Sequence, residues 1–450
     1  MTGISSRYSR SIAPHQPSSR GADDSESNSS QNLRSGGPAL LSAPQPPLLE
    51  ALGGRAPART PVWFMRQAGR SLPEYRRLRA GRPMLESCLD PGLAAEITLQ
   101  PVRRHGVDGA VLFSDIMVPL LLAGVGVRIA EGVGPVLDSP VRSPQDIEAL
   151  IATSQDSGRA PRGRLAPQAL EPIAQAVGRV VAELGAPGRP GAREHLGPRA
   201  RTGLEHSAGQ AGWTPVIGFG GAPFTLAAYM VEGRPSRDHL AARTLMHSEP
   251  AAWDRLMTWC ASITGSFMAA QVRAGAAAAQ LFDSWAGSLS PTDYRERVLP
   301  YSALALGIAG EAVSPTTGRA APLIHFGTGT ARLLAEMRRD ADAVGVDERI
   351  GLREAAEILA ATPAGACPVQ GNIDPALLAA PEAVLGPAVE RCLEEGGAAP
   401  AHVVNLGHGV PPGTDPDVLT GIVAQVHGSD SWRTVAREGW DPLEDEEPGA

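Results

Sequence analysis

Residues 215–229 read PVIGFGGAPFTLAAY, and this stretch shows the unit from which the fold is predicted. An apolar run, Pro215–Phe219, is followed by a glycine-rich turn and then by residues with helical spacing. Eight such runs recur along the chain, each followed by glycine or polar residues and then by a helical pattern. The runs are Val62–Met65, Gly109–Phe113, Pro215–Phe219, Ala278–Phe282, Pro322–Phe326, Ala341–Val346, Cys367–Gln370 and His402–Leu406.

Continuous apolar runs, rather than alternating ones, are typical of parallel strands that are buried on both faces. The segments between them show amphipathic spacing, as in Trp253–Ala274, where one helical stripe holds Leu256, Trp259, Cys260, Ile263 and Phe267. Eight strands that alternate with helices predict an α/β fold, a single (β/α)8 TIM barrel. An open α/β sheet has the same periodicity and remains the structural alternative.

Three segments interrupt this pattern. Residues 1–50 are rich in Ser, Pro, Gly and Gln, which predicts a disordered N-terminal extension. Residues 186–212 form a long polar connection, which we expect to be an insertion loop at the face opposite the barrel mouth. Residues 431–450 are predicted to be an acidic flexible tail. The barrel domain is therefore expected to span residues 51–430.

The composition excludes several classes of protein. The net charge of −8 is unfavourable for nucleic-acid binding, which needs an excess of basic residues. All 40 basic residues are Arg, so a lysine Schiff base and a Walker A lysine are both excluded. A genome rich in GC is the preferred explanation of the arginine bias, and the exclusions hold either way. No apolar stretch is long enough to predict a transmembrane helix.

The four cysteines lie far apart and form no Cys-x-x-Cys or Cys–His cluster, which argues against a disulfide framework or a structural zinc site. The N-terminus carries no apolar segment of the kind found in secretory signals. Both features predict a protein of the reducing cytoplasm.

Polar residues follow five of the eight apolar runs. They include Arg66 and Arg70 after the first run, Asp115 after the second, Ser284 after the fourth and His408 after the last. The carboxyl ends of barrel strands meet at one face, where the active sites of such barrels lie. We therefore expect these side chains to surround one mouth, with Tyr229 joining them from the helix after the third run.

These motifs resemble the uroporphyrinogen decarboxylase family. Pro61–Arg70, PVWFMRQAGR, is similar to its N-terminal signature, and Gly218–Tyr229 is similar to its second signature. The likeness continues in order through Phe113–Ile116, Gln280–Gly287, Gln370–Pro375 and Asn405–Gly409. It spans about residues 55–430.

The resemblance implies a (β/α)8 carboxy-lyase of haem biosynthesis, a homodimer that uses no cofactor and no metal. Such enzymes remove CO2 from the four acetate side chains of uroporphyrinogen III and release coproporphyrinogen III. Loss of CO2 from a pyrrole acetate leaves electrons that need a sink. A proton added to a pyrrole carbon supplies that sink within the substrate, and a buried carboxylate stabilises the resulting cation.

The resemblance assigns roles residue by residue. Asp115 is expected to bind the pyrrole N–H groups and to stabilise the cation. Arg66 and Arg70 are expected to bind substrate carboxylates, because guanidinium suits carboxylate geometry, and Arg66 is also a candidate for organising the proton. The backbone at Gln67, Ala68 and Gly69 is expected to shape the same wall. Further carboxylates are assigned to Tyr229, Ser284 and His408, while the general acid stays unassigned.

Each residue also has a purely structural interpretation. Asp115 could cap the next helix, Arg66 and Arg70 could be surface residues, and Tyr229 could be an ordinary half-buried tyrosine. Ser284 could be a turn residue, and His408 could be structural. The motif context favours the functional interpretation for all of them, least strongly for Ser284.

The chain departs from the family at Glu348, where Trp is usual, and in the 186–212 segment. A corrinoid-dependent methyltransferase on the same barrel is the nearest rival, but it needs a His-x-Cys zinc motif that this chain lacks. A binder of porphyrinogen or haem that has lost catalysis is the second rival. The sequence leaves open the isomer preference, the order of decarboxylation and the effect of Glu348 on activity.

Overall fold

The structure is a computed structural model, which describes residues 44–160, 163–192 and 198–428. Its centre is a curled parallel sheet of seven strands in the order β1-β4-β5-β8-β9-β10-β11. In register, Phe282 lies opposite Phe326, and Asn372 lies opposite Asn405. The strands are β1 Ala110–Val111, β4 Val216–Gly221, β5 Ala278–Asp283, β8 Leu323–Gly327, β9 Ala343–Gly345, β10 Val369–Ile373 and β11 His402–Leu406.

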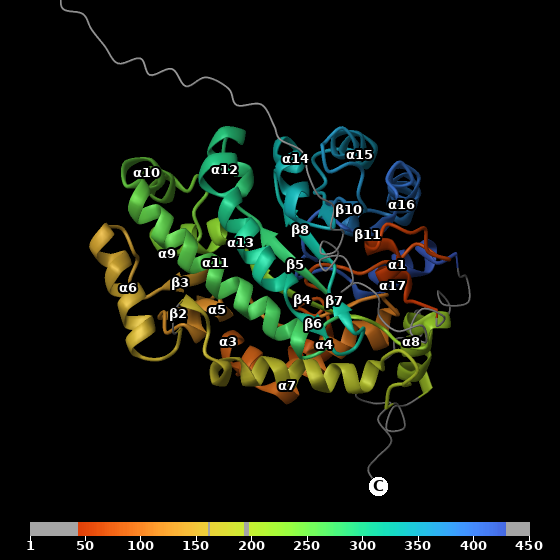
Figure 1. Cartoon of the computed structure of the whole chain (residues 1–450). Helices are drawn as coiled ribbons and strands as arrows, with labels where there is room; N and C mark the ends of the chain where they lie inside the picture. Colours follow the sequence, from red (N-terminus) through yellow and green to blue (C-terminus); the bar gives the residue numbers. More distant parts are fainter. Residues whose placement is uncertain (1–43, 161–162, 193–197, 429–450) are drawn as a thin grey trace, which may run out of the picture. The chain divides into compact units, whose positions relative to one another are not determined.

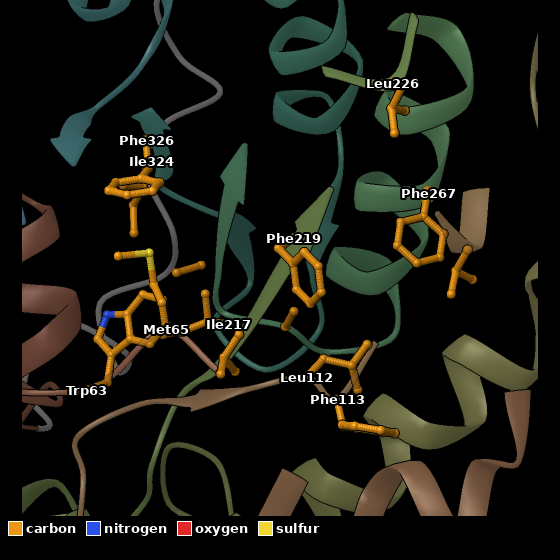
Figure 2. Packing of buried hydrophobic residues seen from close by; sticks show 14 of the residues in the cluster. Trp63, Met65, Leu112, Phe113, Ile217, Phe219, Leu226, Phe267, Ile324 and Phe326 are labelled. Carbon is orange, nitrogen blue, oxygen red and sulfur yellow. The ribbon is translucent and has the colours of Figure 1, made fainter. Parts of the chain in front are cut away.

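Helices cover the outer side of this sheet, and long helices such as α11 and α13 pack side by side there (Figure 1). Buried side chains from separate strands, among them Ile217 and Phe326, fill the interior (Figure 2). The helices are α1 Pro47–Leu52, α2 Pro73–Leu78, α3 Met84–Leu89, α4 Pro91–His105, α5 Val118–Leu122, α6 Pro144–Asp156, α7 Pro167–Leu184, α8 Pro198–Ala208, α9 Pro223–Glu232, α10 Leu240–Ser248, α11 Pro250–Arg273, α12 Pro291–Arg297, α13 Leu299–Gly310, α14 Leu334–Met337, α15 Leu352–Ala360, α16 Glu382–Gly396 and α17 Pro416–Val426.

Local sequence explains where these helices begin and end. Proline occupies the first turn of many of them, where its missing N–H costs nothing. In α4, Asp90 is the N-cap and its Oδ1 accepts hydrogen bonds from the N–H groups of Gly92 and Leu93, each at 3.0 Å. The same helix ends at Gly106, which has φ 65°. The predicted apolar stripe of α11 is buried along its whole length.

The segment at Val62 lies between the two edge strands of the sheet. Val62 forms a parallel bridge with Val404 of β11. On its other side, its carbonyl accepts the N–H of Asp108, just before β1, at 2.8 Å. Asp108 Oδ2 in turn accepts the N–H of Val62 at 2.8 Å. One short segment therefore joins both edges of the curled sheet.

The predicted strands differ from the observed ones in two ways. Val62–Met65, predicted as a full strand, forms only a single bridge, because hydrogen bonds to side chains take over from the ladder beyond Trp63. The prediction also missed two antiparallel hairpins. They are β2 Val127–Ala130 with β3 Gly134–Leu137, and β6 Val313–Ser314 with β7 Arg319–Ala320.

The predicted insertion loop 186–212 contains a helix, α8, so it is not a simple loop. The helix packs against α4, and Ser207 of α8 donates a hydrogen bond to the carbonyl of Val107 ahead of β1. That contact places α8 beside the N-terminal ends of the strands. His206 of the same helix is half-buried and hydrogen-bonded to His427. Burial of α8 against the strand ends explains why this segment is ordered as a helix.

The ordered domain begins before residue 51, because α1 starts at Pro47 and Leu48 is fully buried. Residues 1–43 of the predicted extension and the tail 431–450 lie outside the described residues. The cysteines are unpaired and buried, at Cys88, Cys260, Cys367 and Cys392. In the ranges the structure covers, every helix is too short or too polar to cross a membrane.

Candidate active site

A cavity of about 400 Å³ opens where the sheet strands end. Most of its wall is apolar and includes Phe219, Phe282 and Phe326 from three strands. Their rings meet edge to face, with centroids 5.4 Å apart for Phe219 and Phe282 and 5.8 Å apart for Phe282 and Phe326. Such a wall suits the flat faces of a large apolar ring system.

Five of the predicted polar residues reach this cavity from four separate parts of the chain. They are Arg66, Arg70, Asp115, Ser284 and His408, and Ala68 and Gly69 line it too. Arg66 and Arg70 are exposed, so their guanidinium groups meet solvent. The structure therefore brings together an arginine pair, a carboxylate and an imidazole against an aromatic wall.

Arg66 is held in an uncommon backbone conformation, with φ 62°. The turn around it is closed by a bond from Gln67 N–H to the carbonyl of Phe64 at 3.0 Å. The Gln67 side chain adds two bonds of 2.9 Å, accepting from Phe64 N–H and donating to the carbonyl of Gly109. Asn405 Oδ1 accepts the N–H of Met65 at 3.0 Å. Strain at a functional residue is stable only when neighbours fix it in this way.

Asp115 follows β1 and lines the cavity. Its Oδ1 accepts the N–H of Met117 at 2.9 Å, which ties it to the turn before α5. Its Oδ2 makes no hydrogen bond to any residue in the described ranges. Burial raises the pKa of Asp115, while the Met117 N–H and the Arg66 charge partly lower it again. One oxygen of the carboxyl group therefore holds the turn, and the other is an available acceptor.

His408 and Ser284 line the same cavity. Desolvation, together with the charges of Arg66 and Arg349, lowers the pKa of His408 although its ring keeps an exposed face. The imidazole is therefore neutral near pH 7 and available as a hydrogen-bond partner. The carbonyl of Ser284 accepts a hydrogen bond from Thr328 Oγ1 at 2.5 Å, which fixes the loop after β5.

Two predicted residues do not line the cavity. Tyr229 stacks on Trp285 with ring centroids 3.8 Å apart and is absent from the cavity lining. Burial and the Asp115 charge raise the pKa of Tyr229 to about 12, and the Arg66 charge opposes them. Its hydroxyl is therefore a donor within electrostatic reach of both groups. Gln67 is fully buried, and its side chain supports the turn instead of facing the cavity.

The sequence reasoning missed part of the wall. Ile129 and Pro135, from the β2–β3 hairpin, line the cavity together with Met84. The alternation at Val127 and Ile129, followed by Gly132 and Gly134, is a hairpin signal that periodicity could have revealed. Within the described ranges, no three His, Cys, Asp or Glu side chains group as a metal site would require.

Comparisons with known proteins show what the whole chain is similar to. The model of the family described as uroporphyrinogen decarboxylase matches residues 43–188 and 204–429. A uroporphyrinogen decarboxylase of Arthrobacter sp. (strain FB24) is 53% identical over 85% of this chain and 96% of that protein. One of Saccharopolyspora erythraea is 50% identical over 85% of this chain and 94% of that protein. The gap in the family match, residues 189–203, falls within the 186–212 segment.

A solved structure, a methyltransferase from Methanosarcina mazei, resembles the fold with a TM-score of 0.61. It covers 85% of this chain and 98% of its own, at 16% identity. Identity this low shows the likeness of fold alone.

Proposed function

The chain belongs to the uroporphyrinogen decarboxylase family, and from this premise we propose how its cavity performs the reaction. The substrate is uroporphyrinogen III, and the enzyme, a carboxy-lyase of porphyrin biosynthesis, releases four CO2 molecules to give coproporphyrinogen III. One observation carries the assignment of the site: Asp115 and Arg66 meet in a largely apolar cavity at the strand ends of a chain that matches this family.

The reaction begins when a proton adds to the pyrrole carbon next to the one that bears the acetate, which leaves the ring cationic. Asp115 accepts the pyrrole N–H groups through its free Oδ2 and stabilises that cation. Because the surrounding wall is apolar, the attraction between carboxylate and cation is stronger than in water. The C–C bond to the carboxylate then breaks, its electrons neutralise the ring, and CO2 leaves. A proton then adds to the exocyclic methylene carbon that CO2 has left, and the first proton leaves the ring carbon, which restores the pyrrole.

The other polar groups bind the substrate's carboxylates. Arg66 and Arg70 offer guanidinium forks for paired contacts, while Ser284 and His408 bind carboxylates at the rim. The Tyr229 hydroxyl is assigned as a further hydrogen-bond donor to a substrate carboxylate. Arg66 has a further role, because its charge acts on Asp115, Tyr229 and His408 at once. Every step uses the substrate and residues of this chain, with no metal or cofactor.

We also propose three features of the whole enzyme. The Val62 segment completes a closed eight-stranded barrel, a proposal supported by its bonds to both sheet edges. Family likeness supports a homodimer and a cytoplasmic location. Light scattering on the purified chain tests the dimer, because a dimer doubles the mass of the 46.8 kDa monomer.

The decisive experiment incubates the enzyme with uroporphyrinogen III under anaerobic conditions, in buffer containing a chelator. Products are separated by their number of carboxyl groups. Wild type is expected to convert eight carboxyls stepwise to four, and Asp115→Asn, which keeps the shape but not the charge, is expected to lose about 10²–10³-fold in kcat. Folded wild type that binds substrate without releasing CO2 would instead identify a binding protein.

A further inference from the structure

A series of contacts connects Ser284 with Arg349. Thr328 Oγ1 donates to the carbonyl of Ser284 at 2.5 Å. The next residue, Gly329, donates its N–H to Asp347 Oδ2 at 2.5 Å. The same Oδ2 lies 3.3 Å from Nη1 of Arg349. These contacts link the turn of Arg349 to Ser284, and Glu348 of the same turn packs against Gly407, which precedes His408. Arg349 therefore lies near two residues that the proposed function assigns to substrate carboxylates.

The anchor of Arg349 is rigid. Asp347 is buried, with 1% of its side chain exposed, so its carboxylate is fixed in place. The backbone of the turn is held as well, because Asn372 Nδ2 of β10 donates to the carbonyls of Asp347 and Ile350 at 2.9 and 2.7 Å. Glu348 Oε1 adds a weaker contact, 3.8 Å from Arg349 Nε. One edge of the guanidinium is thus oriented by this chain's own acids.

The other edge of the guanidinium is free. The Arg349 side chain is 61% exposed, and its Nη2 makes no hydrogen bond to the residues that the structure describes. A guanidinium that is held on one edge and open on the other can bind a second carboxylate. The Arg349 side chain then loses little conformational freedom on binding. Its charge also reaches His408, whose pKa it helps to lower.

We propose that Arg349 is a specificity residue that binds a peripheral carboxylate of the substrate between Ser284 and His408. The inference rests on the proposed function and deepens it. Arg349 lines a hollow of about 390 Å³, whose wall also holds the acids Glu348, Asp374 and Glu395 and a second arginine, Arg391. The three acids outnumber the two arginines, so a substrate carboxylate is expected to stay at Arg349 instead of moving deeper. The group bound there is a side chain that is not being decarboxylated.

This position predicts a separation of binding from chemistry. Arg349→Gln removes the charge-assisted contact and is expected to raise KM for the octacarboxylate about tenfold, with kcat changed less than about twofold. The increase in KM should be smaller for substrates with fewer carboxylates. Arg353→Gln is the matched control, because Arg353 is an exposed arginine of the neighbouring helix α15 that lines none of these cavities. It is expected to behave as wild type.

A second readout needs no substrate. Histidine titration by NMR is expected to show a higher pKa for His408 in Arg349→Gln, because a neighbouring positive charge is lost, and no change in Arg353→Gln. Arg349→Lys retains the charge, so it should keep most of the lowering of the His408 pKa. It should lose the two-point contact between guanidinium and carboxylate. A KM for Arg349→Gln within twofold of the control overturns the proposal, whatever the titration shows. Inactive wild type would instead count against the proposed function itself.

Discussion

Gly409 lies so close to Arg66 that a Cβ atom at position 409 would sit 2.5 Å from Arg66 Cδ and 2.8 Å from its Cγ. Gly409 follows β11 and Arg66 follows Val62, so the contact joins segments that are distant in the sequence. The glycine has no positive φ, and its requirement is space rather than backbone conformation. Because Gly409 has no side chain, the Arg66 side chain has room to extend into the cavity.

Gly409→Ala is therefore expected to push Arg66 out of position. Because Arg66 acts on Asp115 and His408, we expect kcat/KM to fall at least about tenfold, while the melting temperature changes little. Steady-state kinetics and thermal unfolding measure the two effects. Gly413→Ala is the control, since no atom lies within 4 Å of the Cβ it would add. Equal activity of the two variants would contradict the steric role of Gly409.

Gln67→Leu tests whether Gln67 supports the Arg66 turn. The change leaves Phe64 N–H and the Gly109 carbonyl without partners in a buried site, which is expected to cost about 2–4 kcal/mol in free energy of unfolding. Urea unfolding measures the loss. Gln155→Leu, an exposed change on α6, is expected to stay within about 0.5 kcal/mol of wild type. A Gln67→Leu enzyme with wild-type stability would show that these two bonds are dispensable.

Arg66→Gln is expected to shift the pH profile of the reaction. Asp115 must be ionised to stabilise the cation, so its pKa sets an acid limb of kcat/KM above the usual carboxyl range. The Arg66 charge lowers that pKa, and its removal should move the limb to higher pH. Arg70→Gln should weaken binding without moving the limb, because Arg70 is absent from the groups that act on Asp115. Identical acid limbs in Arg66→Gln and Arg70→Gln would show that the Arg66 charge does not set the pKa of Asp115.

His206 makes stability depend on pH at the opposite end of the strands. Its Nε2 lies 2.7 Å from His427 Nδ1, and His427 Nε2 lies 2.7 Å from Asp108 Oδ2. Burial, His427 and Arg59 lower the pKa of His206 to about 4, from about 6.5 in the unfolded chain. Between these values the unfolded state binds more protons, so stability falls as pH falls through this window.

We expect the loss between pH 6.5 and 4 to be about 1–2 kcal/mol, after allowing for the partial exposure of His206. Urea unfolding at several pH values measures it. His206→Gln should flatten the slope in this window, while His247→Gln, at an exposed histidine of α10, should leave it unchanged. The lowered pKa of Asp108 acts in the same direction but only below about pH 4. An unaltered slope in His206→Gln would exclude this histidine as the cause.

The alternation of apolar runs and helices was visible in the sequence because each element carries its own period. The runs that became β4, β5, β8 and β11 are buried along nearly their whole length, and the α11 stripe is buried as predicted. The strand-end residues were equally predictable, since the carboxyl ends of parallel strands all lie at one face. The family followed from the motifs at Pro61–Arg70 and Gly218–Tyr229, and the comparisons confirm it.

Only the tertiary structure decided how these residues act on one another. Nothing local marks Gly409 as the neighbour of Arg66, His206 as the partner of His427, or Arg349 as a charge that acts on His408. The supporting role of Gln67 also depends on Gly109, which is distant in sequence. Periodicity records which face of an element is buried, whereas these contacts depend on how separate elements are placed in space. Sequence alone therefore determined the fold class, the family and the candidate residues, and packing between distant segments set their geometry, charges and support.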